Sequence, residues 1–245
     1  DSRSIIVTAF YTHEIVDAPV SDKDNPRGRF PHADRMGALT PMTNHYVEVI
    51  KGFLERQGYE AVSNMSKDNR IPDKMAAARA GVGRYGKNAV ILTREYGAYV
   101  RFVTLVTNAA LAYEEYDLYA SDCGECEVCL RSCPTGAIYK PYEVNRELCI
   151  TEWLWGTFVP IHLREKQENR IFGCGECVDV CPRNKELTPR KKYPVKTEDV
   201  GTAPELIPLV TGCEEYYRRI LPSFPMLAGM DAIRGNAIIA LGHIG

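Results

Sequence analysis

The sequence predicts an α+β protein built in three parts. Short apolar runs with strand character occur at 5–10 and between 89 and 107, and a helical apolar spacing lies between them. Two cysteine-rich runs then precede a final helical stretch. We therefore expect an α+β domain over 1–118, a cysteine-rich module over 119–190 and a helical segment over 191–245. With 245 residues, 45% of them apolar, the chain is long enough to bury a core.

The elements follow from local sequence. The run at 5–10 predicts a buried strand, and "TNHYVEVIKGFLERQGY" (43–59) predicts a helix with Thr43 or Asn44 as its N-cap. "PDKMAAARA" (72–80) predicts a short helix that begins at its proline. Further strands are expected in "AVILT" (89–93) and "YVRFVTLVT" (99–107), and further helices in "APELIPLVTGCEEYYRRI" and "MDAIRGNAIIALGHIG".

Gly81, Gly83 and Gly86 spell G-x-G-x-x-G, the pattern of a dinucleotide-binding fingerprint. That fingerprint follows a strand and opens a helix, whereas here a helix precedes the glycines and a strand follows them. The order of elements therefore argues against a dinucleotide site. We expect the glycines to end the helix in a left-handed conformation and to allow a close backbone approach, for which a ligand is one candidate.

Seven of the nine cysteines fall in two short runs. The first run has the C-x2-C-x2-C-x3-C-P spacing of two-cluster ferredoxins, with Cys123, Cys126, Cys129 and Cys133 before Pro134. In that pattern three thiolates hold one [4Fe-4S] cluster and the fourth thiolate binds the other cluster. A second run is therefore required.

The second run has Cys174, Cys177 and Cys181, but Ile171 stands where its first cysteine is expected. Another thiolate must complete the set, and Cys149, which lies between the runs, is a better candidate than Cys213. The predicted ligands are Cys123, Cys126, Cys129 and Cys181 for one cluster and Cys133, Cys149, Cys174 and Cys177 for the other. We expect Cys213 to be a buried, small apolar residue.

Two other uses of cysteine compete with this interpretation. Disulfides are typical of small secreted chains with a signal peptide, and we find neither feature in the sequence. Four cysteines also suit tetrahedral zinc, but the spacing followed by proline favours iron and sulfur. Two adjacent clusters form an electron relay, so we expect the module to transfer electrons.

The charge and hydropathy of the chain limit which partners and which cellular location we expect. The net charge of −2 argues against a surface built mainly for phosphate backbones. "RNKELTPRKK" (183–192) is locally basic, either as an RNA contact or as a solvated loop. No apolar stretch reaches the roughly 20 residues of a membrane helix, and the first residues lack a signal-peptide pattern. We expect a cytoplasmic monomer without a membrane partner, and a chain that is a fragment at both ends.

Several blocks, taken in order, are typical of one protein family. They are "AARAGVGRYGKNAVILTREYGAYV" (77–100), "CGECEVCLRSCPTGAIYKPYEVNRELCI" (123–150), "NRIFGCGECVDVCPRN" (169–184), "APELI" (203–207) and "IRGNAIIALG" (233–242). On these blocks the chain resembles the epoxyqueuosine reductase family and its relatives, the corrinoid-dependent reductive dehalogenases. The likeness spans nearly the whole chain, and a lone cysteine between the runs, here Cys149, also recurs in that family.

The resemblance implies a nitroreductase-like domain that binds cobalamin, a module with two [4Fe-4S] clusters lying against it, and a short HEAT-like helical tail. It implies that electrons pass through the clusters to the corrinoid, which reduces the substrate while a protein acid supplies a proton. The implied substrate is epoxyqueuosine in tRNA, and the implied electron source is an external low-potential donor of flavodoxin or ferredoxin type. Family members leave the cobalt without a protein histidine, and none of the five histidines has the Asp-x-His-x-x-Gly context.

The proton donor is matched less completely. The tRNA-acting members carry Asp-x-x-Pro-x-x-Glu, with the Asp as donor, where this chain has "KDNRIPDKM". Lys67 falls at the Asp position and Asp73 at the Glu position, so Asp68 is the candidate catalytic donor, or else a solvated loop residue. The dehalogenase relatives suggest tyrosines as donors instead, and the candidates, which are otherwise core aromatics, are Tyr85, Tyr96 and Tyr99.

The candidates for corrinoid binding are Gly83, Lys87, Asn88, Tyr96 and Arg101. Arg101 would otherwise form a salt bridge on its strand face. "CPRN" replaces the "CPWN" of the tRNA-acting members, which leaves two other functions open. One is a dehalogenase-like reduction of a small molecule, and the other is electron transfer to a separate corrinoid protein.

Overall fold

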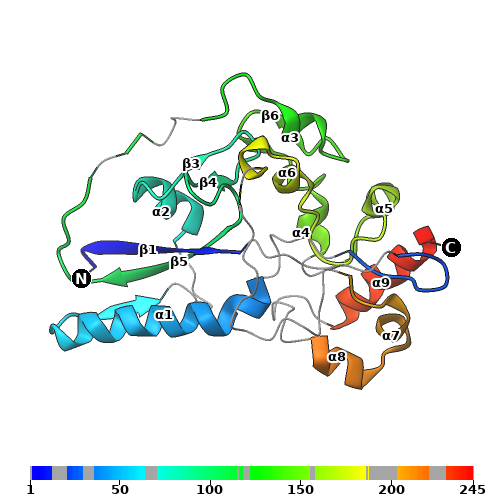
Figure 1. The fold of residues 1–245 in the computed structure, drawn as a ribbon, viewed down its shortest axis with the longest axis horizontal. Coiled ribbons are helices and arrows are strands. Elements are labelled where there is room, and N and C mark those ends of the chain that lie inside the picture. The colour runs from blue at the N-terminus through cyan, green and yellow to red at the C-terminus, as the bar shows by residue number, and fades with distance from the viewer. Residues whose placement is uncertain are drawn as a thin grey trace.

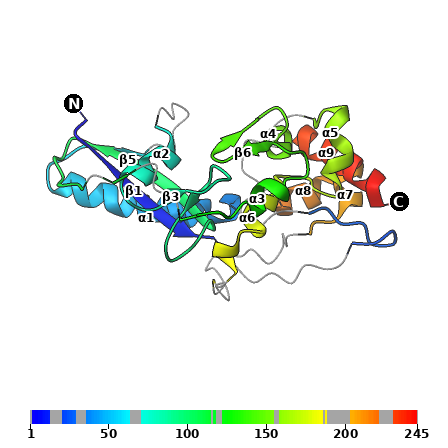
Figure 2. The same ribbon diagram turned by 90° about the horizontal axis from the view of Figure 1, so that it is seen from above.

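A computed structural model describes residues 2–12, 21–29, 36–63, 71–114, 116–117, 122–154, 158–185, 187, 203–220 and 230–244. Its elements confirm the predicted mixture of helices and strands. One region is built on a sheet, and the other gathers the cysteine runs and the C-terminal helices (Figure 1). Seen from above, the two regions lie next to each other (Figure 2). Among the described helices, we find none with the length and apolar character that a membrane crossing requires.

The central sheet has three antiparallel strands in the order β1 (Ser4–Tyr11), β5 (Val100–Thr107) and β2 (Ala61–Ser63). β1 and β5 pair along their full length, from Ser4 opposite Thr107 to Tyr11 opposite Val100. The strands predicted at 5–10 and 99–107 are thereby confirmed.

A helix covers each face of this sheet. Successive side chains of a strand point to opposite faces, so each face has its own apolar side chains to bury. Val103 and Leu105 pack on one face with Val47 of α1 (Met36–Arg56). On the other face, Phe102 packs with the alanines of α2 (Asp73–Arg79). Figure 1 shows α1 and α2 on opposite sides of β1 and β5. The sheet region therefore has its own core.

α1 begins at Met36 rather than near Thr43, so the N-cap predicted at Thr43 or Asn44 is wrong. Both residues lie inside the helix, where the backbone N–H groups bond to carbonyls four residues earlier and leave nothing to cap. Thr43 is instead fully buried. The helix ends at Arg56, and Gly58 follows with a positive φ of 84°.

The glycine block ends α2 as predicted. Gly81 has a φ of 69°, and its N–H and that of the next residue bond back to the last turn of α2 in a Schellman arrangement. β3 (Arg84–Tyr85) and β4 (Ile91–Leu92) then pair as antiparallel strands. A Cβ on Gly83 would lie 2.6 Å from the carbonyl oxygen of Leu92. The close approach at Gly83 is thus to the chain's own backbone.

Short elements build the cysteine module. α3 (Val128–Arg131) and α6 (Glu176–Asp179) carry parts of the two runs and contact each other. The other described elements of this stretch are β6 (Ile138–Lys140), β7 (Glu143–Val144), α4 (Ile150–Leu154), α5 (Ile161–Gln167) and the 3-10 helix η2 (Pro182–Asn184).

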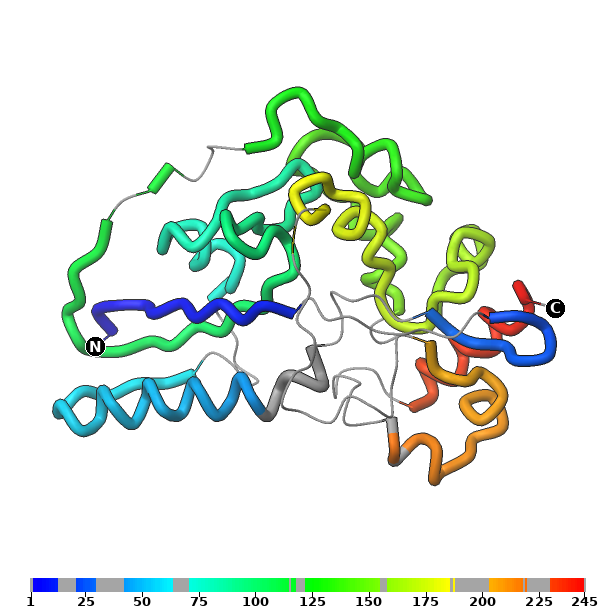
Figure 3. The backbone as a smooth tube through the Cα atoms, in the orientation of Figure 1, coloured from blue at the N-terminus to red at the C-terminus, as the bar shows by residue number. Residues whose placement is uncertain are grey.

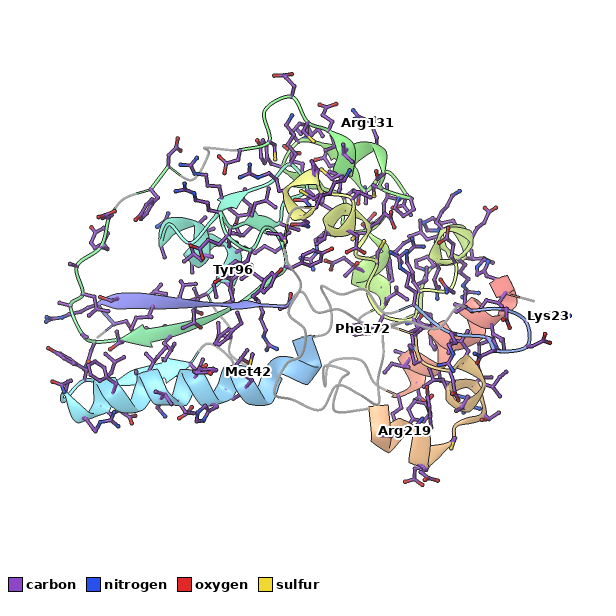
Figure 4. The ribbon with its side chains drawn as sticks, viewed as in Figure 1. Lys23, Met42, Tyr96, Arg131, Phe172 and Arg219 are labelled. Carbon is purple, nitrogen blue, oxygen red and sulfur yellow. The ribbon has the colours of Figure 1, made fainter. Side chains whose placement is uncertain are left out.

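The last part is helical, as predicted, with α7 (Leu206–Thr211), α8 (Glu214–Ile220) and α9 (Met230–Ile244). Its core joins Leu209 and Ile233 to Ile171 and Phe172, which directly precede the second cysteine run. Figure 4 shows Phe172 between the cysteine module and these helices. The second run is therefore anchored on the helical part.

Residues 21–29 lie against the same helical part, far from the strand that precedes them in sequence. The N–H of Gly28 bonds to the carbonyl of Pro204 at 2.9 Å, and the N–H of Leu206 bonds to the carbonyl of Pro26 at 3.0 Å. Arg29 forms a parallel bridge with Arg170. Figure 3 shows this blue segment beside the orange and red C-terminal helices.

Cys213 is exposed, so the expectation of a buried residue is wrong. It lies in the turn between α7 and α8, after Gly212 with a φ of 74°. Its N–H bonds to the carbonyl of Pro208, and its own carbonyl accepts from Tyr217, both at 3.0 Å. The turn uses the backbone of Cys213 and leaves the thiol at the surface.

Replacing Gly81 with alanine should lower the free energy of unfolding by about 1–2 kcal/mol, because a residue with a Cβ pays about that much in the left-handed conformation. The new Cβ would also overlap the ring of Tyr116, which is partly exposed and can move. Urea denaturation measures the change. Gly242→Ala is the control, because Gly242 lies within α9 with open space where a Cβ would stand. Equal losses in the two variants would contradict the prediction.

Candidate metal centre

The two cysteine runs meet through their short helices. Cys129 lies in α3 and Cys177 in α6, and these helices are in contact. Cys133 and Cys181 come just after the ends of α3 and α6. Each run thus places its last cysteine beyond a helical turn, where it can lie closer to the other run than to its own.

One group of thiols contains three cysteines of the first run and the last of the second. Burial raises the pKa of Cys129, and the thiols of Cys123 and Cys181 raise it further. Burial also raises the pKa of Cys181, with contributions from Cys123 and Cys126. Cys123, Cys126, Cys129 and Cys181 thus interact electrostatically with one another, and their assignment to one cluster stays a prediction.

The other group crosses the runs in the opposite direction. Burial raises the pKa of Cys177 far above its ordinary value, and the thiols of Cys174, Cys149 and Cys133 add to the effect. Cys149 interacts in turn with Cys133, and Cys174 with Cys149. A weaker interaction between Cys177 and Cys129 connects the two groups.

A four-iron cluster spaces its ligands differently from a single metal ion. Within the described stretches, no three histidine, cysteine or carboxylate side chains converge on one point as the ligands of one metal ion do. In a four-iron cluster each thiolate binds a different iron, so the four sulfurs stand apart around a cube. Buried thiols that raise one another's pKa are held as thiolates when a bound cation supplies the opposite charge.

Backbone N–H groups also point at the sulfurs. Burial tends to raise the pKa of Cys133, but hydrogen bonds from the backbone of Ile138, Thr135 and Ala137 outweigh it, and the pKa is lowered. Cys149 accepts similar bonds from Thr151 and Glu152, although burial still raises its pKa. Such bonds favour the thiolate form and are one of the factors that set a cluster's reduction potential.

Asn88 connects the glycine block to the second run. Its Nδ2 donates a hydrogen bond to the carbonyl of Cys177 at 2.9 Å, and its Oδ1 accepts one from the N–H of Val90 at 3.2 Å. Both ends of this buried amide, which is one of the candidates for corrinoid binding, are thus used within the chain.

Asn184 makes a second connection, which sequence reasoning missed. Its Oδ1 accepts a hydrogen bond from the N–H of Ala98 at 2.9 Å, and its Nδ2 donates one to the carbonyl of Val178. Gly97 makes room for this contact, because a Cβ there would overlap Asn184. The only signal was an asparagine directly after the second cysteine run, in "CPRN".

The other corrinoid candidates differ in their surroundings. Gly83 packs on β4, while Lys87, Tyr96 and Arg101 are half-buried. The ring of Tyr96, labelled in Figure 4, lies 4.8 Å from that of Tyr11. Burial lowers the pKa of Arg101, and the nearby Asp73 partly offsets this.

The candidates for the proton donor also differ in their surroundings. Asp68 lies outside the described residues, as do the last residues of the basic stretch at 183–192. Tyr99 is buried and donates a hydrogen bond from its hydroxyl to Asp179 at 3.0 Å. Burial and Asp179 raise the pKa of Tyr99 far above its usual value. Tyr99 is therefore a core residue that links the chain just before β5 to α6.

Sequence comparisons agree with the cysteine pattern. Residues 122–184 match a family model described as a 4Fe-4S double cluster binding domain. The chain is 32% identical over 248 residues to the epoxyqueuosine reductase of Bacillus subtilis (strain 168), and 30% identical over 250 residues to that of Bacillus anthracis. These alignments cover 99% of this chain and 63% and 64% of the two relatives. The chain thus spans somewhat less than two thirds of their length.

Solved structures give the same result. The fold matches an epoxyqueuosine reductase with a tRNA-Tyr epoxyqueuosine-modified tRNA stem loop at a TM-score of 0.82, and the Bacillus subtilis enzyme with its catalytic loop swung out of the active site at 0.81. Both are 29% identical, over 98% of this chain and 64% of theirs. The resemblance to epoxyqueuosine reductases is thereby confirmed.

Replacing Asn184 with alanine should lower the free energy of unfolding by about 1–3 kcal/mol, because the N–H of Ala98 would be left unpaired in a buried place. The carbonyl of Val178 would lose one of its two donors and keep the N–H of Cys181. Urea denaturation followed by tryptophan fluorescence measures the loss. The neighbouring exposed Lys185 provides the control variant, Lys185→Ala, which should be nearly neutral. If Asn184→Ala is as stable as the parent protein, the side-chain amide of Asn184 does not stabilise the fold.

Proposed function

We propose that this chain is an iron–sulfur and cobalamin-dependent reductase that acts on epoxyqueuosine in tRNA. The observation that carries the proposal is the likeness to epoxyqueuosine reductases over 99% of the chain. The match of 122–184 to a double-cluster domain adds the redox module that such a reduction needs. This chain spans less than two thirds of the length of those relatives, so their activity comes to this chain only as a proposal.

The proposed cluster ligands are those expected from the sequence. Cys123, Cys126, Cys129 and Cys181 hold one [4Fe-4S] cluster, and Cys133, Cys149, Cys174 and Cys177 hold the other. The electrostatic grouping of the thiols supports this assignment. The backbone N–H groups directed at Cys133 and Cys149 support it as well, because bound clusters accept such bonds.

The finer proposal is that electrons pass from an external flavodoxin or ferredoxin through both clusters to a cobalamin, which supplies a strongly reducing metal centre when bound. In this proposal the sheet region is a nitroreductase-like cobalamin domain, and α7 to α9 begin a HEAT-like tail. Lys87, Tyr96 and Arg101 are the candidates to contact the corrinoid. Gly83 and Asn88 would shape its surroundings through the contacts they make within the chain.

The proposal is tested by anaerobic reconstitution with iron, sulfide and cobalamin, followed by metal analysis and an assay on tRNA that carries epoxyqueuosine. We expect about eight irons and one cobalt per chain, and conversion of epoxyqueuosine to queuosine. Eight irons without cobalt would refute the reductase and favour the electron-transfer protein. Full metal content without conversion of epoxyqueuosine would refute epoxyqueuosine as the substrate and favour a dehalogenase-like enzyme.

Two cysteine variants test the fourth ligand of the second cluster. Cys149→Ser should lose about half of the iron, because a cluster with an unfilled ligand position is unstable. Cys213→Ser is the matched control and should keep all the iron, because Cys213 is exposed in a turn outside the two groups. Iron loss in Cys213→Ser with full iron in Cys149→Ser would overturn the assignment.

Asp68 is the proposed proton donor. Asp68→Asn removes the acidic proton and should slow turnover by about 10²–10⁴-fold, the usual contribution of a general acid. Iron and cobalt content should not change. Tyr85→Phe and Tyr96→Phe are measured in parallel, because Tyr85 and Tyr96 are the alternative donors that are half-buried. A loss of turnover in one tyrosine variant, with normal turnover in Asp68→Asn, would assign the proton to that tyrosine.

A further inference from the structure

Arg170 is the one buried charged residue among those the structure describes, with a side chain only 4% exposed. It lies four positions before Cys174, next to the buried Ile171 and Phe172. A buried charge is costly unless it is paired. The groups around the guanidinium of Arg170 must therefore offset the cost of burying its charge.

Two carboxylates pair with the guanidinium. Nη1 of Arg170 lies 2.6 Å from Glu168, and Nη2 lies 3.2 Å from Glu176. Glu168 is 63% exposed, so water screens much of its charge. Glu176 is shared with Arg29, at 3.5 Å. Within the described part of the chain, Nε of Arg170 has no hydrogen-bond partner. The pairing is thus incomplete on one edge of the guanidinium.

The ion pair with Glu176 holds this cation beside the second cysteine run, because Glu176 begins α6 between Cys174 and Cys177. Burial tends to lower the pKa of Arg170, but Cys174, Glu168 and Glu176 outweigh this effect, and the pKa is raised. In return, Arg170 opposes the rise in the Cys174 pKa that burial causes. The cation therefore lies close to one of the two thiol groups, in a place shielded from water.

We infer that Arg170 is a positioning residue that holds a fixed positive charge beside the cluster of Cys133, Cys149, Cys174 and Cys177 and raises its reduction potential. This inference rests on the proposed iron–sulfur function. One-electron reduction, with the electron from the external donor, adds a negative charge to the cluster. A nearby cation stabilises that charge, and more strongly when water does not screen it.

Arg146 provides a matched comparison on the same group. It also interacts with a ligand of this group, Cys149, but its side chain is 78% exposed and pairs with Glu152. Solvent screens an exposed charge, so Arg146 should have little influence on the potential. The side chain of Arg146 is thus exposed where that of Arg170 is buried.

The test is an EPR-monitored redox titration of the reconstituted chain, in which the signal of this cluster is identified by its loss in Cys149→Ser. Arg170→Gln should make reduction of that cluster about tenfold less favourable, which is about 59 mV more negative for a one-electron couple. Glu176→Gln, which removes an anion from the same network, should move the potential in the opposite direction. Arg170→Lys should keep most of the parental potential, and Arg146→Gln nearly all of it.

An unchanged potential in Arg170→Gln with full iron would overturn the inference, and so would equal shifts in Arg170→Gln and Arg146→Gln. If Arg170→Gln fails to hold iron, the sign of the shift in Glu176→Gln decides, because a merely structural ion pair predicts no shift to a higher potential. Failure of the parent chain to bind iron would instead refute the proposed function itself.

Discussion

The last thiol of each cysteine run interacts electrostatically with thiols outside its own run, and the contact that this requires constrains the second half of the fold. Cys133 joins Cys149, Cys174 and Cys177, while Cys181 joins the first three cysteines of the chain. These interactions are possible only if α3 and α6 lie against each other, as they do. The long connection between the runs must then fold back on itself, and the hairpin of β6 and β7 with α4 and α5 accomplishes this.

The same constraint explains where the polar contacts of the interior are placed. Asn88 and Asn184 join the sheet region to the second run through backbone atoms, and Tyr99 joins it through Asp179. Buried polar groups of this kind must be paired, so they hold one relative position of the two regions. Electron transfer between a cluster and any group bound on the sheet region depends on such a fixed separation. Arg29 and Arg170 extend the network toward the C-terminal helices.

Several features could be predicted because they depend on neighbours in the sequence. The cysteine spacing, the strand at 5–10 and the helix ended by Gly81 each follow from local periodicity or from backbone conformation. The N-cap at Thr43 was wrong because a good capping residue also occurs inside helices. Cys213 was expected inside on composition alone, but the turn that contains it needs only its backbone. Asn184 was missed because its partners, Ala98 and Val178, are set by packing.

The sequence by itself determined the class of chemistry, since thiol spacing and the following prolines limit which metal groups the runs suit, and it determined the order of the main elements. Only the tertiary structure decided that Asn88 contacts the second run and that Arg170 is buried and paired with Glu176 beside that run. The reason is physical. Spacing acts over a few residues along the chain, whereas burial and electrostatic interaction depend on distance in space between segments that may be far apart in sequence.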